Sequence, residues 1–520
     1  MSATLESITD IDSLARLVLE IDENIKDYLD VTAILEALGV SDATAQRYGF
    51  PDKFQLSKKV LEIIQYYRQR GETVGAYRVP EQRRLLEAVK LVLVGSLLAS
   101  PWLLFTLSYL FIGITLLPIG GPGLATMISL ASILSLLVTS GIQTLFTRRI
   151  TFYYYQQNYG AARGVLTLYY ALSICIVFAT GLLTLAVNNI FHIYPRGWIE
   201  LSVIYFIPLS FLWISTAPLY ALNAYTPLVF TFLASLLSIN LALRMSMRSI
   251  YMQAHLYGIA VGAIIATIYF SVYLYVKERL LKAASPYQRE LEARLPRLTY
   301  IIYSGFPYLV SSTLYFLFIT ADRLIAWFTA GNQPPLMDTT YEFSVNLALL
   351  LLVPVFGILN YCMARIYGAV SEGGRGVEAK RIEEYRNRIK SAYWRALLAV
   401  SLTGLISHAV ICLLTLKFNV LQLSVYPKVL IYAGIADTLL SLFLVNSLIC
   451  FYFYLPRPII TSLTLGLAVD VLVGLPLAKT MGIQYASIGY LAGAAVLAVV
   501  SIVNTYRYVR EADYSYYSAF

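Results

Sequence analysis

The sequence predicts an all-α polytopic membrane protein with about twelve transmembrane helices in two six-helix lobes, preceded by a small helical cytoplasmic domain. Apolar residues make up 58% of the 520 residues and charged residues 13%, and the mean hydropathy of +0.67 is far above that of soluble proteins. Apolar runs of about 20 residues, the length that crosses a bilayer core, recur from Lys90 to Tyr506. An internal repeat further indicates two lobes.

The first 82 residues are predicted to form a separate cytoplasmic domain. They have no apolar core segment behind a basic start, so no secretory signal is predicted. Residues 31–50 have the helix, Gly turn and helix pattern of a small DNA-binding motif, and a further helix is expected from Gln55 to Arg70. However, residues 1–80 hold 9 Lys and Arg against 13 Asp and Glu, which argues against nucleic acid. We interpret this part as a helical bundle that docks a partner protein.

Two regions, residues 83–285 and 286–520, are predicted to contain six spans each. An even number places both termini on one side of the membrane. With both in the cytoplasm, the inner loops carry 26 Lys and Arg and the outer loops 7, as the positive-inside rule requires. The chain is therefore expected in the cytoplasmic membrane. The predicted spans are residues 89–117, 123–146, 165–187, 199–222, 226–243, 254–276, 298–320, 341–364, 394–416, 428–453, 457–477 and 484–506.

The internal repeat relates the first span to the seventh. Residues 100–112 (SPWLLFTLSYLFI) align without a gap with residues 306–318 (FPYLVSSTLYFLF), which places Pro101 on Pro307. The second and eighth spans end alike, in TRRI and MARI. Because odd spans match odd spans, the two lobes are predicted to have the same orientation, with a cavity between them.

Prolines in the spans are candidates for gating or kinks. Each removes a backbone hydrogen bond and lets a helix bend. Pro101 and Pro307 are expected in the first-turn region of the two repeat helices, and Pro354 lies within the eighth span. A static kink is the alternative interpretation for each.

Ionisable residues inside spans are costly and are candidates for function. Asp322 and Glu342 lie near the predicted outer ends of the seventh and eighth spans. Each candidate also has a structural explanation. Asp322 and Arg323 could form an ion pair at the outer surface, and the other acids and His408 could be members of buried pairs or interfacial residues. Arg149 and Arg365, which the repeat relates, could anchor the chain to the inner leaflet. The candidates for translocation or coupling are Asp470, Asp437, Asp322, Arg323, Glu342, Arg149, Arg365 and His408.

Enzyme motifs are missing from the sequence. The four cysteines lie in apolar runs without a C-x-x-C spacing, so no metal site is predicted. Asp10 and Asp12 form the only D-x-D, which lies before the first span, and there is no H-E-x-x-H, P-loop or G-x-S-x-G. No cofactor is predicted, and a membrane ligase or glycosyltransferase ranks below a transporter.

Five segments in order resemble the PelG-type exopolysaccharide exporters. In the third, Asp322, Arg323 and Trp327 occupy the places of that family's D-K-W-I-F-W-F stretch, and in the fourth Pro354 and Arg365 match its eighth helix. Two departures are Ser100, where the family usually has glycine, and Tyr367, where an acid is expected. The segments are residues 99–113, 144–155, 314–328, 341–366 and 506–520.

This resemblance implies the fold of the multidrug/oligosaccharidyl-lipid/polysaccharide (MOP) flippases and export of an amino-sugar polymer. It also implies a polysaccharide or oligosaccharide substrate, membrane partners of PelD and PelE type and a cytoplasmic glycosyltransferase. The 42 tyrosines are compatible with sugar stacking, although an aromatic belt explains most of them. A flippase for a lipid-linked oligosaccharide and an ion-coupled small-molecule antiporter of the same fold are the alternatives.

Overall fold

The computed structural model is helical throughout the residues that it describes, and the chain separates into two compact units, residues 1–89 and 90–520. Each unit has its own hydrophobic core. The described residues are 11–21, 25, 27–38, 40, 42–69, 81–99, 121–245, 251–284, 297–331, 334–373, 382–417 and 425–519.

The N-terminal unit contains four short helices around a small core. The Asp27 carboxylate accepts hydrogen bonds from the backbone N–H groups of Leu29 and Asp30 at 2.8 and 3.0 Å, which starts the second helix. The aliphatic residues Leu14, Val18, Leu35, Val60 and Ile64 are fully buried. The helix expected at residues 55–70 is present as α5, and the predicted helix–turn–helix corresponds to α3 and α4. The helices are α2 (Ile11–Ile21), α3 (Tyr28–Ala37), α4 (Asp42–Arg47) and α5 (Lys53–Gln69).

Eleven helices of the described residues are long and apolar enough to cross a membrane. They coincide with the second to twelfth predicted spans, so a multi-pass membrane protein is confirmed. Of the first predicted span, only α6 (Glu81–Ser96) and η1 (Leu97–Ala99) are described. Pro101 lies outside the described residues.

The first group of membrane helices packs around one large core, which contains Tyr169, Phe206 and Phe270. These helices carry apolar residues on all sides. Some of the side chains pack in the core, and many others are exposed on the outer surface of the helices, as expected for a protein surrounded by lipid. The group, called the first lobe below, comprises α8 (Gly121–Tyr155), α9 (Tyr159–Phe191), α10 (Arg196–Ala221), α11 (Tyr225–Arg244) and α12 (Tyr251–Ala284).

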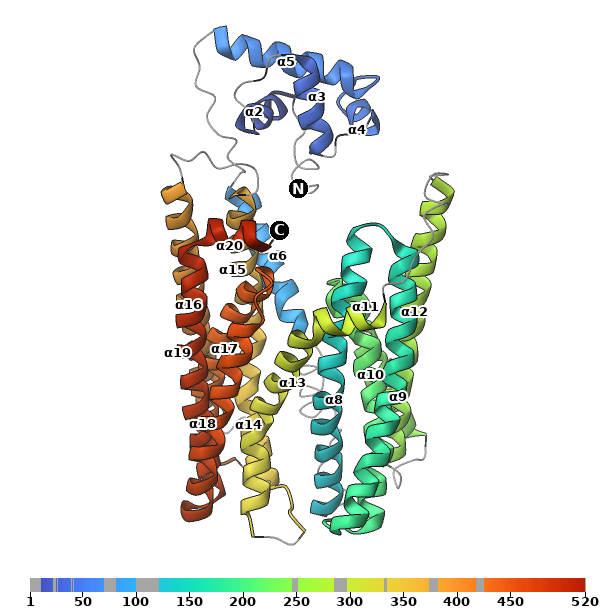
Figure 1. Ribbon diagram of the computed structural model, residues 1–520, viewed down its shortest axis with the longest axis vertical. Coiled ribbons are helices and arrows are strands. Elements are labelled where there is room, and N and C mark those ends of the chain that lie inside the picture. The colour runs from blue at the N-terminus through green and yellow to red at the C-terminus, as the bar shows by residue number, and fades with distance from the viewer. Residues whose placement is uncertain are drawn as a thin grey trace. The chain divides into compact units, whose positions relative to one another are not determined.

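The second lobe packs around two adjoining cores, one containing Phe318, Phe443 and Tyr490 and the other Tyr393 and Ile449. Figure 1 shows its helices in yellow to red. They are α13 (Leu298–Thr329), α14 (Thr339–Ala348), η4 (Leu349–Leu351), α15 (Leu352–Gly373), α16 (Ile382–Cys412), η6 (Leu413–Lys417), α17 (Pro427–Tyr452), α18 (Arg457–Met481), η7 (Ile483–Tyr485), α19 (Ala486–Arg510) and α20 (Ala512–Ala519).

Two candidate prolines lie at different places in their helices. Pro307 was expected in a first-turn region, but α13 begins at Leu298, as the predicted span does, so Pro307 lies inside the helix and beyond its first turn. Pro354 lies in the first turn of α15, directly after the 3₁₀ turn η4 that interrupts the eighth span. Since proline lacks an N–H, the carbonyl of Leu350 has no donor at that position, which favours the break there.

Two glycines allow helices to approach each other closely. Gly141 on α8 faces Leu309 and Thr313 of α13, and Gly357 on α15 faces Val92 and Ser96 of α6. The pairing that aligns TRRI with MARI also aligns Gly141 with Gly357, so the two glycines occupy equivalent positions under the predicted repeat, although the residues they face do not correspond. Small residues let membrane helices approach closely.

Gly357→Ala is expected to weaken this contact. A Cβ at this position meets the Ser96 Oγ at 2.6 Å and the Val92 carbonyl oxygen at 2.7 Å, and overpacking costs about 1–3 kcal/mol. Thermal unfolding of the detergent-purified protein measures this loss. Gly368→Ala is the matched control, because it lies on the same helix and its added Cβ meets open space. Equal melting temperatures of the two variants contradict the prediction.

Candidate functional site

Three aspartates from three different helices are completely buried in the second lobe. Asp322 lies on α13, Asp437 on α17 and Asp470 on α18, and each has 0% of its surface exposed. The Asp322 carboxylate is within electrostatic range of both Asp437 and Asp470. We call these three residues the aspartate cluster.

Each aspartate of the cluster has at least one carboxylate oxygen without a hydrogen-bond donor in the described part of the chain. The hydroxyl of Tyr341 donates to Asp322 Oδ2 at 2.8 Å, and that of Tyr490 donates to Asp437 Oδ1 at 2.7 Å. The other oxygen of each is unpartnered, as are both oxygens of Asp470. Buried polar atoms are normally paired, so these four oxygens are open to a further ligand.

Beside the cluster, Arg323 forms a buried ion pair. Its Nη1 lies 2.7 Å from Glu342 Oε2, and the two side chains are 11% and 5% exposed. The indole N–H of Trp327 donates to the other Glu342 oxygen at 2.9 Å. Arg323 therefore pairs with Glu342, and the alternative explanation of Asp322 and Arg323 as an outer-surface ion pair is wrong, because both residues lie in the interior.

Close packing of α18 against α19 buries Asp470. A Cβ added to Gly493 meets the Asp470 Cβ at 2.8 Å and the Gly466 carbonyl at 2.6 Å. Gly474 and Gly489 also face each other at this crossing. Small residues on both helices therefore bring the two backbones together around Asp470.

The charges of this region do not balance. Four carboxyl groups, those of the cluster and of Glu342, lie near one guanidinium group, that of Arg323. Isolated charges in an apolar interior are very costly. The arrangement therefore favours binding of a proton or a cation. Within the described residues, no group of three His, Cys, Asp or Glu side chains is placed to hold a metal ion.

Five of the predicted site residues come together in this way, and three lie elsewhere. The ring of His408 packs against Gly434 of α17, with Cys412 Sγ 3.5 Å from its Nε2. Arg365 is exposed near the end of α15. Arg149 lies where the two lobes meet.

Arg149 and its neighbour Arg148 bind the second lobe from the end of α8. Arg149 Nη2 donates to Ser304 Oγ at 2.6 Å. The Arg148 guanidinium lies 3.8 Å from the ring centroid of Tyr308 and 4.5 Å from that of Tyr454. Tyr454 holds a left-handed backbone with φ of 58°, which is unusual for a tyrosine. These contacts join α8, α13 and the turn after α17.

Several functional candidates were missed from the sequence. Tyr341 and Tyr490 were not singled out among the 42 tyrosines, and Trp327 was named only in the family motif, although all three donate hydrogen bonds to buried carboxylates. His255 on α12 is 2% exposed, and its Nε2 has no partner among the described residues. Its position in an apolar run was a signal that could have identified it. Nothing in the tyrosine pattern could have identified the others.

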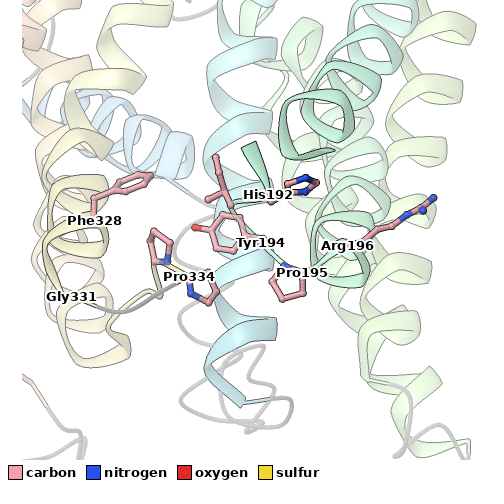
Figure 2. Close-up of a pocket in the computed structure, with 9 residues that line it drawn as sticks. His192, Tyr194, Pro195, Arg196, Phe328, Gly331 and Pro334 are labelled. Atoms are coloured by element: carbon pink, nitrogen blue, oxygen red, sulfur yellow. The ribbon is translucent and has the colours of Figure 1, made fainter. Parts of the chain in front are cut away.

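A cavity of about 800 Å³ lies between connections of the two lobes. The α9–α10 connection contributes residues from His192 to Arg196, and the second lobe contributes Phe328 at the end of α13 with residues of the following loop. Figure 2 shows Phe328, Tyr194 and Pro334 near one another, whereas Arg196 points away.

The family model of PelG, described as "Putative exopolysaccharide Exporter (EPS-E)", matches residues 82–517. A comparison with curated proteins gave no match.

The chain is also similar in structure to MATE transporters. A crystal structure of a MATE mutant has a TM-score of 0.58 and 14% sequence identity, covering 82% of this chain and 96% of that one. An outward-facing multidrug resistance MATE family transporter of the MOP superfamily gives a TM-score of 0.57, 14% identity and coverages of 82% and 96%. An inward-facing transporter of the same family gives a TM-score of 0.56 and 14% identity, covering 81% of this chain and 95% of that one. The predicted MATE-like two-lobe fold is thus confirmed.

Proposed function

This chain belongs to the PelG family of putative exopolysaccharide exporters, and from this membership we propose that it exports an amino-sugar polysaccharide across the cytoplasmic membrane by movement of its two lobes. The observation that carries the proposal is the family match over residues 82–517. Being a transporter and not an enzyme, the chain needs a path for a hydrated polymer and a source of energy. Our candidate for the path is the interface between the two lobes, and our candidate for the site that couples export to a source of energy is the aspartate cluster.

The aspartate cluster is proposed as the coupling site. The affinity of a buried carboxylate for a proton or a monovalent cation depends on the groups around it. Binding at the cluster can therefore favour one arrangement of the helices over another. Asp322 lies on α13, the helix that also contacts α8 of the first lobe through Leu309 and Thr313. A change of charge at Asp322 can therefore reach the contact between the lobes.

The arginines at the end of α8 are proposed to hold the lobes together in this conformation. Alternating access requires that contacts between the lobes form at one end while others break. The guanidinium of Arg148 on two tyrosine rings and the Arg149–Ser304 hydrogen bond are contacts of this kind. His408, Arg365 and the proline kinks are proposed to support the helices and not to contact the substrate.

Arg148→Ala and Tyr454→Ala are expected to be non-additive in thermal unfolding. Each removes the same cation–π contact, which is worth about 0.5–2 kcal/mol, so the double variant should be little less stable than Arg148→Ala alone. A double-mutant cycle on the detergent-purified protein measures the coupling. Losses of stability that add within about 0.5 kcal/mol contradict the contact. Arg148→Lys should recover only part of the coupling, because its ammonium does not stack as a guanidinium does.

The N-terminal unit and the termini complete the proposal. We infer that both termini lie in the cytoplasm, where the N-terminal unit docks a membrane partner of PelD or PelE type or the glycosyltransferase that makes the polymer. Its acidic composition favours a basic partner surface. Reporter fusions at each terminus, active only in the cytoplasm, test the orientation, and an inactive reporter at either end contradicts it.

The proposed function is tested in a strain that lacks this chain. Secreted and cell-associated amino-sugar polysaccharide should be lost while product accumulates inside the cell, and the wild-type chain should restore export. Unchanged polysaccharide overturns the proposal. Accumulation of a lipid-linked oligosaccharide instead favours the flippase alternative, and sensitivity to small molecules with normal polysaccharide favours the antiporter.

A further inference from the structure

The cavity between the two lobes has walls built from aromatic and proline rings. Phe328 exposes 60% of its surface, and Tyr194, Pro334 and Pro335 line the same space (Figure 2). A volume of about 800 Å³ falls in the usual range for small-ligand sites, about 300–1,000 Å³. The exposed ring of Phe328 is suited to the apolar C–H face of a pyranose sugar, whereas Tyr194 is only 9% exposed.

Hydrogen bonds to the backbone fix the α9–α10 connection, which forms the first-lobe wall of the cavity. The side chain of Asn188 on α9 accepts from the Tyr194 N–H at 2.9 Å and donates to the Tyr194 carbonyl at 3.0 Å. His192 caps α9 in the left-handed conformation, with φ of 49°. The connection is therefore a fixed turn, and Tyr194 is presented to the cavity with little conformational freedom to lose on binding.

Polar groups of the cavity are hydrogen-bond donors. Burial raises the pKa of Tyr194, so its hydroxyl stays a neutral donor. His192 adds a ring nitrogen at the rim. Arg196 belongs to the same connection but points away from the cavity (Figure 2), and its Nε donates to Glu200 Oε1 at 2.9 Å, so the donors at the cavity are the Tyr194 hydroxyl and the His192 ring. Such donors match the hydroxyl and acyl oxygens of an N-acetylated sugar.

We propose that this cavity binds a short segment of an N-acetylated hexosamine chain as the chain leaves the transporter. The inference rests on the proposed function, because with both termini in the cytoplasm the α9–α10 and α13–α14 connections lie at the outer end. Residues of both lobes line the cavity. Its binding surface therefore changes when the lobes move, so it holds the emerging segment in one conformation and releases it in the other.

Binding is tested with the purified full-length protein and an N-acetylhexosamine tetrasaccharide, by calorimetric titration. Phe328→Ala should weaken binding about fivefold to tenfold, the loss of one stacking contact. Phe328→Tyr keeps the ring and should bind as the wild type does. Phe191→Ala is the matched control, since Phe191, the last residue of α9, is 69% exposed and does not line the cavity. A photo-reactive benzoylphenylalanine at position 328, but not at 191, should become cross-linked to polymer in exporting cells.

The outcomes separate this inference from the proposed function. If the wild-type chain restores export but Phe328→Ala binds the tetrasaccharide as tightly as Phe191→Ala does, the cavity is not a saccharide site and the proposed function stands. If Phe328→Ala lowers export with unchanged binding and position 328 cross-links to a protein, the cavity contacts a partner and the inference is overturned. If the wild-type chain restores no export, the proposed function itself fails.

Discussion

Asp470→Asn is expected to reduce polysaccharide export at least about tenfold, within the range of typical coupling energies, while leaving the protein folded in the membrane. Asparagine has nearly the same shape as aspartate, so the packing of α18 against α19 is retained. It cannot gain or lose a proton and binds a cation more weakly. Both oxygens of Asp470 are unpartnered among the described residues, so the substitution breaks no hydrogen bond that the structure shows.

The measurement is secreted polysaccharide in the deletion strain complemented with each variant, normalised to the amount of protein in the membrane. Glu384→Gln is the control, because Glu384 is an exposed carboxylate at the start of α16. Full export by the Asp470→Asn variant excludes Asp470 from coupling. Asp322→Asn and Asp437→Asn should also impair export, and each in addition changes a hydrogen bond to a tyrosine.

Experiments on the purified protein can decide whether the aspartate cluster takes up Na⁺ or a proton. If it is Na⁺, replacing potassium chloride by sodium chloride should raise the melting temperature of the wild type by mass action and leave that of Asp470→Asn unchanged. If it is a proton, neither protein should respond to sodium, and export in cells should instead depend on the pH gradient. A sodium response of equal size in both proteins places the cation elsewhere.

Arg323→Ala is expected to cost about 3–5 kcal/mol of stability, because it leaves the Glu342 carboxylate buried without its cation. Trp327 still donates to Glu342, but one neutral donor does not replace a guanidinium. The amount of folded protein in the membrane and its melting temperature in detergent should both fall. Arg365→Ala is the matched control, since Arg365 is exposed.

Combining Arg323→Met with Glu342→Gln tests the reason for this loss. The double variant removes both charges and keeps similar side-chain volumes, so much of the lost stability should return. If the double variant is less stable than Arg323→Ala, the two residues are not coupled as a pair. Export by the double variant then shows whether Arg323 acts only in folding or also sets the charge beside the aspartate cluster.

Most of the membrane architecture could be predicted from local sequence. The spans were identified because about 20 apolar residues in a row have few alternatives to crossing a bilayer, and the motifs from residue 99 to 520 indicated the family. Helix ends were predicted less well: α13 starts at Leu298, where the predicted span starts, but it continues to Thr329 and not to residue 320, which places Asp322 inside the helix.

The sequence by itself determined that Asp322, Arg323, Glu342, Asp437 and Asp470 are exceptional, because a charged group in an apolar run is costly wherever the run lies. Only the tertiary structure decided that these residues gather in one lobe, that Arg323 pairs with Glu342, and that Arg148 and not only Arg149 joins the lobes. The physical reason is that the apolar pattern of a buried membrane helix is nearly uniform around its axis. Its rotation and its neighbours are then set by close contacts, such as those at Gly466 and Gly493, which link residues far apart in the chain.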